Sequence, residues 1–419
     1  MKLGFLRTDT LKFSFITISS TIINGLLGAL FYILLARLIG PREFGLVIVA
    51  VTTLTMIADI ADFGTNSALL KSVASKINDS VYIYKSIKLA SVFKTTIWIL
   101  LLAGSWFAPF AAANLFHQPS LTPFLMLVPI GVGGAMFLSL MTSLLQGLQN
   151  YKFWSGIQIG TNLLRLFLLW GLYYIKQLNG INSFLLFIIV PFVGVLICLL
   201  KLPIRKIAQA KVESAQVTNF FSFSSWVGLM ITITAFSSRL DTFLNARFLE
   251  AAQVGVYAAA SQLISVMPQV ISALGVVAAP RFASFTNNGD AWNYFKKFMQ
   301  LVGGLAIVGV VLLPVALLLI PLVLGSAYTQ AQTPFAILFI AMILFLLSVP
   351  IHNAIIYYLH KPSFFVATSI INLCLMLLVG PMLIMRYGVV GTSMMVLMTM
   401  LFNLFVPLGF LLLKMRNGK

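Results

Sequence analysis

The amino-acid sequence predicts an all-α protein that crosses a membrane many times. Of its 419 residues, 60% are hydrophobic and 9% are charged, whereas soluble domains average about 45–50% apolar and about 25% charged residues. The mean hydropathy is +1.03, so most backbone groups must be hydrogen-bonded inside lipid, which only helices or a closed barrel achieve. The long apolar runs lack the two-residue alternation of barrel strands. Helices are therefore predicted, and a soluble enzyme is excluded.

Twelve apolar stretches are long enough to span a bilayer. The first six lie at 13–36, 44–69, 90–113, 122–146, 153–175 and 182–202. The second six lie at 220–246, 254–279, 298–320, 333–358, 363–385 and 389–413. The first stretch is too long for a signal peptide and leads directly into further spans, so we expect it to be retained. The short connections leave no room for a soluble catalytic or nucleotide-binding domain.

The distribution of basic residues predicts the orientation. Of the 27 Lys and Arg residues, twenty, including Lys94, lie at the N-terminus, in the even-numbered connections or at the C-terminus. Six lie on the opposite side, and Arg165 alone is expected in the middle of a span. Because Lys and Arg are enriched in cytoplasmic loops, both termini are predicted to be cytoplasmic. Basic loops that meet anionic lipids explain the formal charge of +18 without a nucleic-acid partner.

Residue types that would indicate catalysis or a cofactor are scarce. The only cysteines, Cys198 and Cys374, fall inside apolar stretches, so neither a disulfide framework nor a metal site is predicted. A polytopic enzyme would need a cluster of metal-binding carboxylates or a sizeable outer loop with catalytic acids. Asp59 and Asp62 form only one pair of acids, and the outer loops are short. We therefore expect no enzyme activity, no catalytic residue and no cofactor.

The chain resembles itself at an offset of 210 residues. The matched pairs include Arg37 with Arg247, Gly45 with Gly255, and Asn162 with Asn372. Each half would hold six spans, so both halves would share one orientation and be related by a pseudo-two-fold axis along the membrane normal. The sequence thus predicts an N-terminal lobe at 1–210 and a C-terminal lobe at 211–419, with the substrate between them.

Two acids in the second span are candidates for ion coupling. Ionisable groups inside a bilayer cost at least about 2.5 kcal/mol each, so the few that occur usually face a water-filled cavity. Asp59 and Asp62 are three residues apart, on one helix face, and Asn66 follows in the same direction. We expect Asp59 to bind a coupling ion. Asp62 could share this role or could help to end the helix, and Asp241 is the next candidate.

The fifth span carries a polar stripe that ends in an arginine. Gln158, Thr161, Asn162 and Arg165 follow at i, i+3, i+4 and i+7, so they share one face that cannot contact lipid. Arg165 would lie about 20 Å from the cytoplasmic end of its helix, too deep to reach the interface easily. It is the best candidate for an anion contact. A structural ion pair with Asp59 is the alternative.

Other polar positions are assigned less specific roles. A stripe in the first span and another in the eighth are expected on the inter-lobe face, without individual contacts, because small residues at helical spacing usually pack helices together. Packing between helices is also the alternative for the stripe of the fifth span, because Gly156 and Gly160 form a GxxxG on a neighbouring face. Arg239 and Asp241 form either a local ion pair or a gate. The two stripes comprise Ser14, Thr17, Thr21, Asn24, Gly25 and Gly28, and Gln262, Ser265, Gln269 and Ser272.

Two regions carry a resemblance to a known family. Residues 36–46 (ARLIGPREFGL) and 58–64 (ADIADFG) resemble the first two helices of the bacterial polysaccharide transporter family. Residues 238–244 (SRLDTFL), 254–260 (VGVYAAA) and 279–282 (APRF) resemble its seventh and eighth helices. This family includes O-antigen flippases and shares a superfamily with multidrug and toxin extrusion antiporters.

The resemblance implies a flippase in the bacterial cytoplasmic membrane. Such a protein moves an oligosaccharide linked to polyprenyl pyrophosphate to the outer leaflet by alternating access of two lobes, with a proton or sodium as the coupling ion and a polysaccharide polymerase as a further partner. The family's cationic role would fall on Arg165, Arg239, Arg37 and Arg247. Arginine suits a diphosphate because its planar fork pairs with two oxygens and keeps its charge when buried.

The remaining candidates concern the sugar and the competing functions. Amides of Gln158, Asn162 and Asn24 could hold the sugar. Twelve spans argue against a peptidoglycan precursor as substrate, because its flippases usually have two more. A cation-coupled multidrug antiporter is the alternative function. Asp59 would suit an antiporter, whereas the buried Arg165 weighs against one.

Overall fold

The computed structural model describes residues 9–417, and every regular element in this range is helical. Lys2, Arg7 and Lys419, which enter the orientation argument, lie outside the described residues. The chain forms two compact units. The first comprises the described residues up to Ile39 and Leu46–Phe243, and the second comprises Gly40–Gly45 and Leu244–Lys419 as far as it is described. The predicted lobe boundary at residue 210 remains a prediction.

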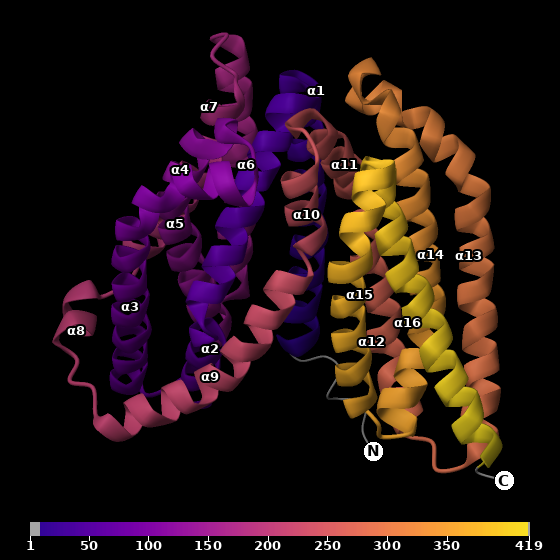
Figure 1. Cartoon of the computed structure of the whole chain (residues 1–419). Helices are drawn as coiled ribbons and strands as arrows, with labels where there is room; N and C mark the ends of the chain where they lie inside the picture. Colours follow the sequence, from indigo (N-terminus) through magenta and orange to yellow (C-terminus); the bar gives the residue numbers. More distant parts are fainter. Residues whose placement is uncertain (1–8, 418–419) are drawn as a thin grey trace. The chain divides into compact units, whose positions relative to one another are not determined.

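Helix α1 (Asp9–Asp62) contains the first predicted span and most of the second (Figure 1). It is kinked at Gly40, where φ is 78° and ψ is 169°, and Pro41 follows without a backbone N–H to continue the hydrogen-bond ladder. The helix ends at Asp62, because Phe63 and Gly64 have φ angles of 47° and 74°. These left-handed conformations break the predicted span 44–69 before α2 (Thr65–Ser75) begins.

The rest of the first unit is a set of helices joined by short turns. Helices α3, α6 and α7 each begin at a side-chain cap. Asp79 accepts a hydrogen bond from the N–H of Tyr82, and Asn179 accepts one from the N–H of Asn182. The elements are α3 (Ser80–Ala103), η2 (Gly104–Phe107), α4 (Ala108–Phe110), η3 (Ala111–Leu115), η4 (Pro119–Leu121), α5 (Thr122–Gly147), α6 (Tyr151–Tyr174), α7 (Gly180–Leu199), α8 (Ile204–Gln209) and α9 (Ser214–Ser237).

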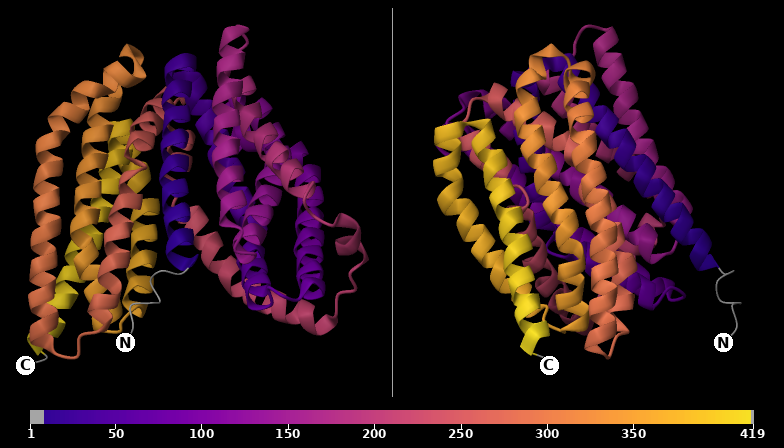
Figure 2. Two further views of the ribbon diagram at one scale, coloured as in Figure 1. Left: turned by 180° about the vertical axis from the view of Figure 1, so that it is seen from behind. Right: turned by 90° about the vertical axis from the view of Figure 1, so that its right-hand side faces the viewer.

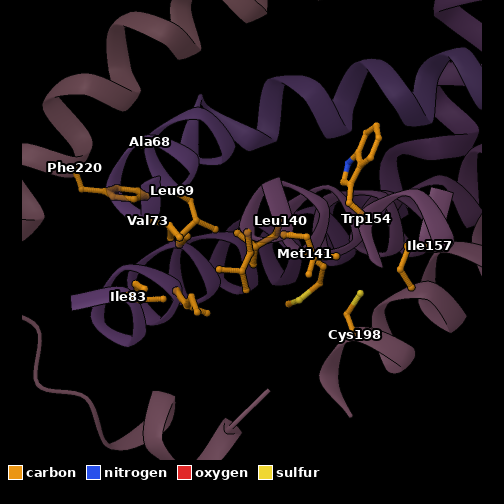
Figure 3. Packing of buried hydrophobic residues seen from close by; sticks show 14 residues of the cluster. Ala68, Leu69, Val73, Ile83, Leu140, Met141, Trp154, Ile157, Cys198 and Phe220 are labelled. Atoms are coloured by element: carbon orange, nitrogen blue, oxygen red, sulfur yellow. The ribbon is translucent and has the colours of Figure 1, made fainter. Parts of the chain in front are cut away.

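A buried apolar cluster joins six helices of the first unit (Figure 3). Leu69 and Val73 of α2 meet Ile83 of α3 and Leu140 of α5. Within a membrane, close packing rather than exclusion of water holds helices together, so this cluster fixes α2 against its neighbours. The other helices contribute Trp154 and Ile157 of α6, Cys198 of α7 and Phe220 of α9.

The second unit is built around four long helices that run side by side (Figure 2). Helix α14 packs against α13 and α16, and α15 packs against α16. The elements are α10 (Leu240–Phe248), α11 (Ala251–Ile264), α12 (Met267–Ala283), α13 (Asn288–Leu324), η5 (Ser326–Ala331), α14 (Gln332–Asn353), η6 (Ala354–Tyr358), α15 (Ser363–Tyr387) and α16 (Val389–Asn417).

The glycines matched at the offset of 210 face each other in the second unit. A Cβ atom on Gly45 would lie 1.9 Å from the carbonyl oxygen of Ala251, and one on Gly255 would lie 1.9 Å from that of Pro41. Only glycine allows the two backbones to approach so closely. The internal repeat therefore contains a pair of residues that form one contact.

Nine helices within residues 9–417 are long and apolar enough to cross a membrane. The chain is thus an all-helical, multi-pass membrane protein, as the composition predicts. Three features make this number smaller than the twelve predicted spans. The stretch Ile16–Asp62 counts once although it is kinked at Gly40, and the predicted span 254–279 is divided between α11 and α12. Helix α6, with its polar stripe, is not among the nine.

Candidate functional site

A cavity of about 210 Å³ lies in the first unit, where α1 breaks and α2 begins. Its walls come from four helices, and its lining combines two carboxylates with an amide and three hydroxyl groups. The lining residues are Thr55, Ala58, Asp59 and Asp62 of α1, Asn66 and Ser67 of α2, Ala135 and Ser139 of α5, and Ile231 of α9. Both candidate ion-coupling acids of the second predicted span therefore face one cavity.

Helix α9 holds the break between α1 and α2 that forms this cavity. The hydroxyl of Ser224 donates a hydrogen bond to the carbonyl oxygen of Phe63. A Cβ atom on Gly64 would lie 2.5 Å from the carbonyl oxygen of Ser224, and one on Gly228 would lie 2.7 Å from that of Phe63. The close fit at the break places Ile231, one turn beyond Gly228, at the cavity wall.

Asp62 forms a buried ion pair with Lys94 of α3. Its Oδ1 atom is 2.6 Å from the Nζ atom of Lys94, and the two side chains are 7% and 0% exposed. Lys94 also donates to the carbonyl oxygen of Met136 at 3.1 Å. Asp62 additionally accepts hydrogen bonds from the hydroxyl of Thr65 at 2.9 Å and from the backbone N–H of Asn66. Asp62 thus stabilises the turn between α1 and α2 and also places a carboxylate at the cavity.

The burial of Lys94 corrects the sequence prediction. Lys94 is counted among the basic residues on the cytoplasmic side, and Arg165 is predicted to be the only cation deep in a span. The structure buries Lys94 completely, because Asp62 supplies a partner that the sequence does not reveal. One feature of the sequence did indicate this burial, because Lys94 lies inside the predicted span 90–113.

Asp59 forms an ion pair with Arg239, which lies between α9 and α10. The Nη2 atom of Arg239 is 2.6 Å from Oδ2 of Asp59, and its Nη1 atom donates to the carbonyl oxygen of Ala235 at 3.1 Å. The side chains of Arg239 and Asp59 are 22% and 48% exposed. Asp59 is therefore paired with Arg239, not with Arg165. Asp241 accepts a hydrogen bond from the backbone N–H of Thr242 at 2.7 Å.

Neutral polar groups complete the cavity lining. The side-chain amide of Asn66 donates to the hydroxyl of Ser139 at 3.0 Å, and Ser139 donates to the carbonyl oxygen of Met136 at 2.9 Å. The Oδ1 atom of Asn66 is buried and has no hydrogen-bond partner within the described part of the chain. One lining residue of the cavity thus holds a buried amide oxygen without a hydrogen-bond partner among the described residues.

Arg165 lies in a second polar group, between α1, α6 and α7. Its Nη1 atom donates to Oδ1 of Asn162 at 3.2 Å, and the amide of Asn162 donates to Oδ1 of Asn24. The guanidinium lies over the rings of Phe187 and Phe31, at 4.7 and 5.6 Å from the ring centres. Three of the predicted substrate-binding residues, on two helices, are therefore brought together.

The charge of Arg165 is not neutralised by a carboxylate of the described residues. Its Nε atom is buried and makes no hydrogen bond in the structure as described. A buried guanidinium with an unused donor is costly in a medium of low dielectric. The arrangement can therefore accept an anion, since an anion would supply both the missing charge and the missing acceptor.

The other predicted site residues are more dispersed. Gln158 lies on the same helix as Arg165 and is partly buried. Arg37 is exposed near the kink of α1, and Arg247 is partly buried in the last turn of α10. Neither lines the cavity. A Cβ atom on Gly156 or Gly160 would meet no described atom within 4 Å, so these glycines mark no helix contact in the structure.

The second unit holds its own polar groups. His352 contacts the carbonyl oxygen of Asn403 through Nε2 at 3.0 Å. The side-chain amide of Asn372 donates to Oδ1 of Asn403 at 2.6 Å. Asn372 is the repeat counterpart of Asn162, so matched asparagines lie in polar contacts in both units. Among the residues described, no group of three or more His, Cys, Asp or Glu residues could hold a metal ion.

The connection between α7 and α9 is tied to α3. The Nζ atom of Lys88 donates to the carbonyl oxygens of Ala208 and Ala210, both at 2.8 Å. Lys85 pairs with Glu213, and the hydrogen bond from Lys85 lowers the pKa of the Glu213 carboxyl, which lies outside the spanning helices. We call these contacts the α3 tether. It ends directly at the start of α9, the helix that closes the cavity.

Buried charges beside a cavity in a multi-pass helical protein are typical of a membrane transporter. The sequence matches the family described as "Polysaccharide biosynthesis protein" over residues 10–286. The chain belongs to this family, which confirms the resemblance found in its sequence. A search among curated proteins gives no match.

Solved structures with a similar fold include a lipid II flippase and MATE transporters. A structure described as "Lipid II flippase MurJ, inward closed conformation" has a TM-score of 0.67 at 14% identity, over 95% of this chain and 87% of that chain. An inward-facing multidrug resistance MATE family transporter of the MOP superfamily has a TM-score of 0.67 at 12% identity, over 94% and 95%. The eukaryotic MATE transporter AtDTX14 has a TM-score of 0.62 at 16% identity, over 98% and 96%. These similarities show a shared fold.

Proposed function

We propose that the chain is a flippase for oligosaccharide repeat units linked to polyprenyl pyrophosphate. It would move an O-antigen or exopolysaccharide unit from the cytoplasmic to the outer leaflet of the bacterial inner membrane. The observation that carries the proposal is the uncompensated charge of Arg165 in a protein of the polysaccharide biosynthesis family. The pyrophosphate is the part of such a substrate that a guanidinium binds best.

The proposal includes the architecture that alternating access needs. Twelve helices would form two lobes, at 1–210 and 211–419, around a pseudo-two-fold axis along the membrane normal, with both termini in the cytoplasm. The kink at Gly40, the division of 254–279 and the mutual approach of Gly45 and Gly255 support this arrangement. The fold shared with the lipid II flippase and the MATE transporters also supports it.

The proposed roles follow the two polar groups of the first unit. Arg165 would bind the pyrophosphate, while Asn162, Asn24 and Gln158 would hold sugar hydroxyls. Arg239, Arg37 and Arg247 would contribute further positive charge along the path. Asp59 and Asp62, with Asp241 as a further candidate, would couple transport to a proton or sodium. A polysaccharide polymerase would receive the flipped unit.

A multidrug antiporter is not favoured, because the family match is to polysaccharide biosynthesis and the drug transporters share the fold alone. The test is transport by purified protein in liposomes. A fluorescent disaccharide on polyprenyl pyrophosphate would be placed in both leaflets, and its exposure to an external glycosidase would be followed. We expect complete digestion with the protein and about half without it, and no uptake of ethidium. Drug transport without flipping would overturn the proposal.

A further inference from the structure

The two ion pairs at the cavity differ in how easily they can open. The Asp62–Lys94 pair is almost fully enclosed, with side chains 7% and 0% exposed. The Asp59–Arg239 pair reaches the surface, with side chains 48% and 22% exposed. Separating the enclosed pair would leave bare charges in a medium of low dielectric, whereas the exposed pair can separate with water at hand. The Asp59–Arg239 pair is therefore the contact that can exchange.

Arg239 has unused capacity for a second anion. A guanidinium has five N–H donors, and the described bonds of Arg239 go to Oδ2 of Asp59 and to the carbonyl oxygen of Ala235. A diphosphate offers more negative charge and more oxygens than a carboxylate, so it can compete with Asp59 for this side chain.

The charges around Asp59 are balanced only while Arg239 is in place. Asp59, Asp62, Lys94 and Arg239 sum to zero when all four are ionised. The lining from α2, α5 and α9 adds the neutral groups of Asn66, Ser139 and Ile231. Lys94 stays bonded to Asp62 at 2.6 Å. If Arg239 leaves, no basic side chain of the cavity lining replaces it, and Asp59 becomes an unpaired acid beside a cavity.

From this geometry we propose that Arg239 is an exchangeable ligand that couples the substrate anion to a cation. The diphosphate of the substrate displaces Asp59 from Arg239, and the freed Asp59 takes up a proton or a sodium ion at the cavity. Anion and cation then bind the first unit with positive cooperativity, and by linkage each strengthens the binding of the other. This coupling rests on the proposed function, because it needs a diphosphate substrate.

The first test uses the full-length protein in detergent and geranyl pyrophosphate as a soluble probe. In Asp59→Asn the competitor for Arg239 has lost its charge, so the variant should bind the probe roughly two- to fivefold more tightly than the native protein, the range for a partly exposed ion pair. Arg239→Gln should weaken binding, and the double variant should bind no more tightly than Arg239→Gln. The exposed Asp290→Asn, in the second unit, is the matched control and should change nothing.

The second test identifies the cation that Asp59 takes up, and its main measurement uses the native protein. Probe affinity of the native protein should rise as the pH falls from 8 to 7, or as sodium replaces choline at constant ionic strength. Asp59→Asn should lose this dependence. Protonation of the probe itself is common to both proteins and cancels in the comparison. A pH effect identifies the proton as the cation, and a sodium effect identifies sodium.

The outcomes separate this inference from the proposed function. If the native protein binds the probe but Asp59→Asn binds it equally or more weakly, Arg239 is not exchangeable and the coupling is wrong while the flippase proposal stands. The same holds if pH and sodium act equally on the native protein and Asp59→Asn. If no protein binds the probe, the coupling is wrong. If lipid-linked sugar is not flipped either, the proposed function fails as well.

Discussion

The buried Asp62–Lys94 pair should be essential for the stability of the first unit, and its two members should not be equivalent. Lys94 has no exposed surface, and apart from Asp62 its ammonium group bonds the carbonyl oxygen of Met136. Asp62→Asn would therefore leave a buried cation without its counter-charge, which costs about 3–5 kcal/mol. Lys94→Met should cost less, because Asp62 keeps hydrogen bonds from Thr65 and Asn66 and borders the cavity.

A double-mutant cycle measures this asymmetry. We expect Asp62→Asn to lower the midpoint of thermal unfolding by about 6 °C or more, taking about 2–4 °C per kcal/mol for a unit of this size. The double variant should recover most of that loss, because it contains no unpaired charge. The assay is thermal unfolding of the purified protein in detergent, with Lys152→Met at an exposed position of α6 as the control. Strictly additive effects, or single variants within about 2 °C of the native protein, would refute this reasoning.

Three further predictions concern packing and the α3 tether. Gly45→Ala and Gly255→Ala should each abolish accumulation of folded protein, because the added Cβ would lie 1.9 Å from a backbone oxygen. The control is Gly156→Ala, whose added Cβ would meet no atom within 4 Å. This variant should be at least as stable as the native protein, as judged by gel filtration. Lys88→Ala should speed tryptic cleavage in the connection after α7, since two hydrogen bonds hold it; unchanged cleavage would contradict the tether. The lowered pKa of Glu213 means that its ion pair with Lys85 contributes at neutral pH and is lost only as the pH falls through that pKa. Glu213→Gln should therefore speed tryptic cleavage at pH 7, and unchanged cleavage at that pH would contradict a role of this ion pair in the tether.

The sequence predicts the membrane class well because hydropathy is a local property. Most residues of each predicted span are helical in the structure, although the spans 44–69, 220–246 and 254–279 are each divided between two helices. The polar stripe of α6 correctly indicates that Asn162 and Arg165 share a face. These features depend on composition and on helical spacing, which can be read from short stretches of sequence. Gly45 and Gly255, which match at the repeat offset, also lie in contact, which the sequence did not predict.

The partners of the charged residues could not be predicted in the same way. Asp59 and Arg239 are 180 residues apart, and nothing local distinguishes Arg239 from Arg165 as the partner of Asp59. Lys94 could equally have extended its long side chain to the interface. The break at Phe63 and Gly64 depends on their fit against α9, a contact between distant segments that periodicity does not reveal.

The central claim is that Arg165 binds the pyrophosphate of a lipid-linked sugar. The most direct measurement is flipping of that substrate in liposomes by Arg165→Ala and Arg165→Lys, with the folded protein in each preparation measured by gel filtration. Arg165→Ala should be folded and inactive, because no described carboxylate depends on this arginine. Arg165→Lys should flip more slowly than the native protein, because it keeps the charge but loses the two-pronged geometry. Native rates in a folded Arg165→Ala variant would contradict the claim.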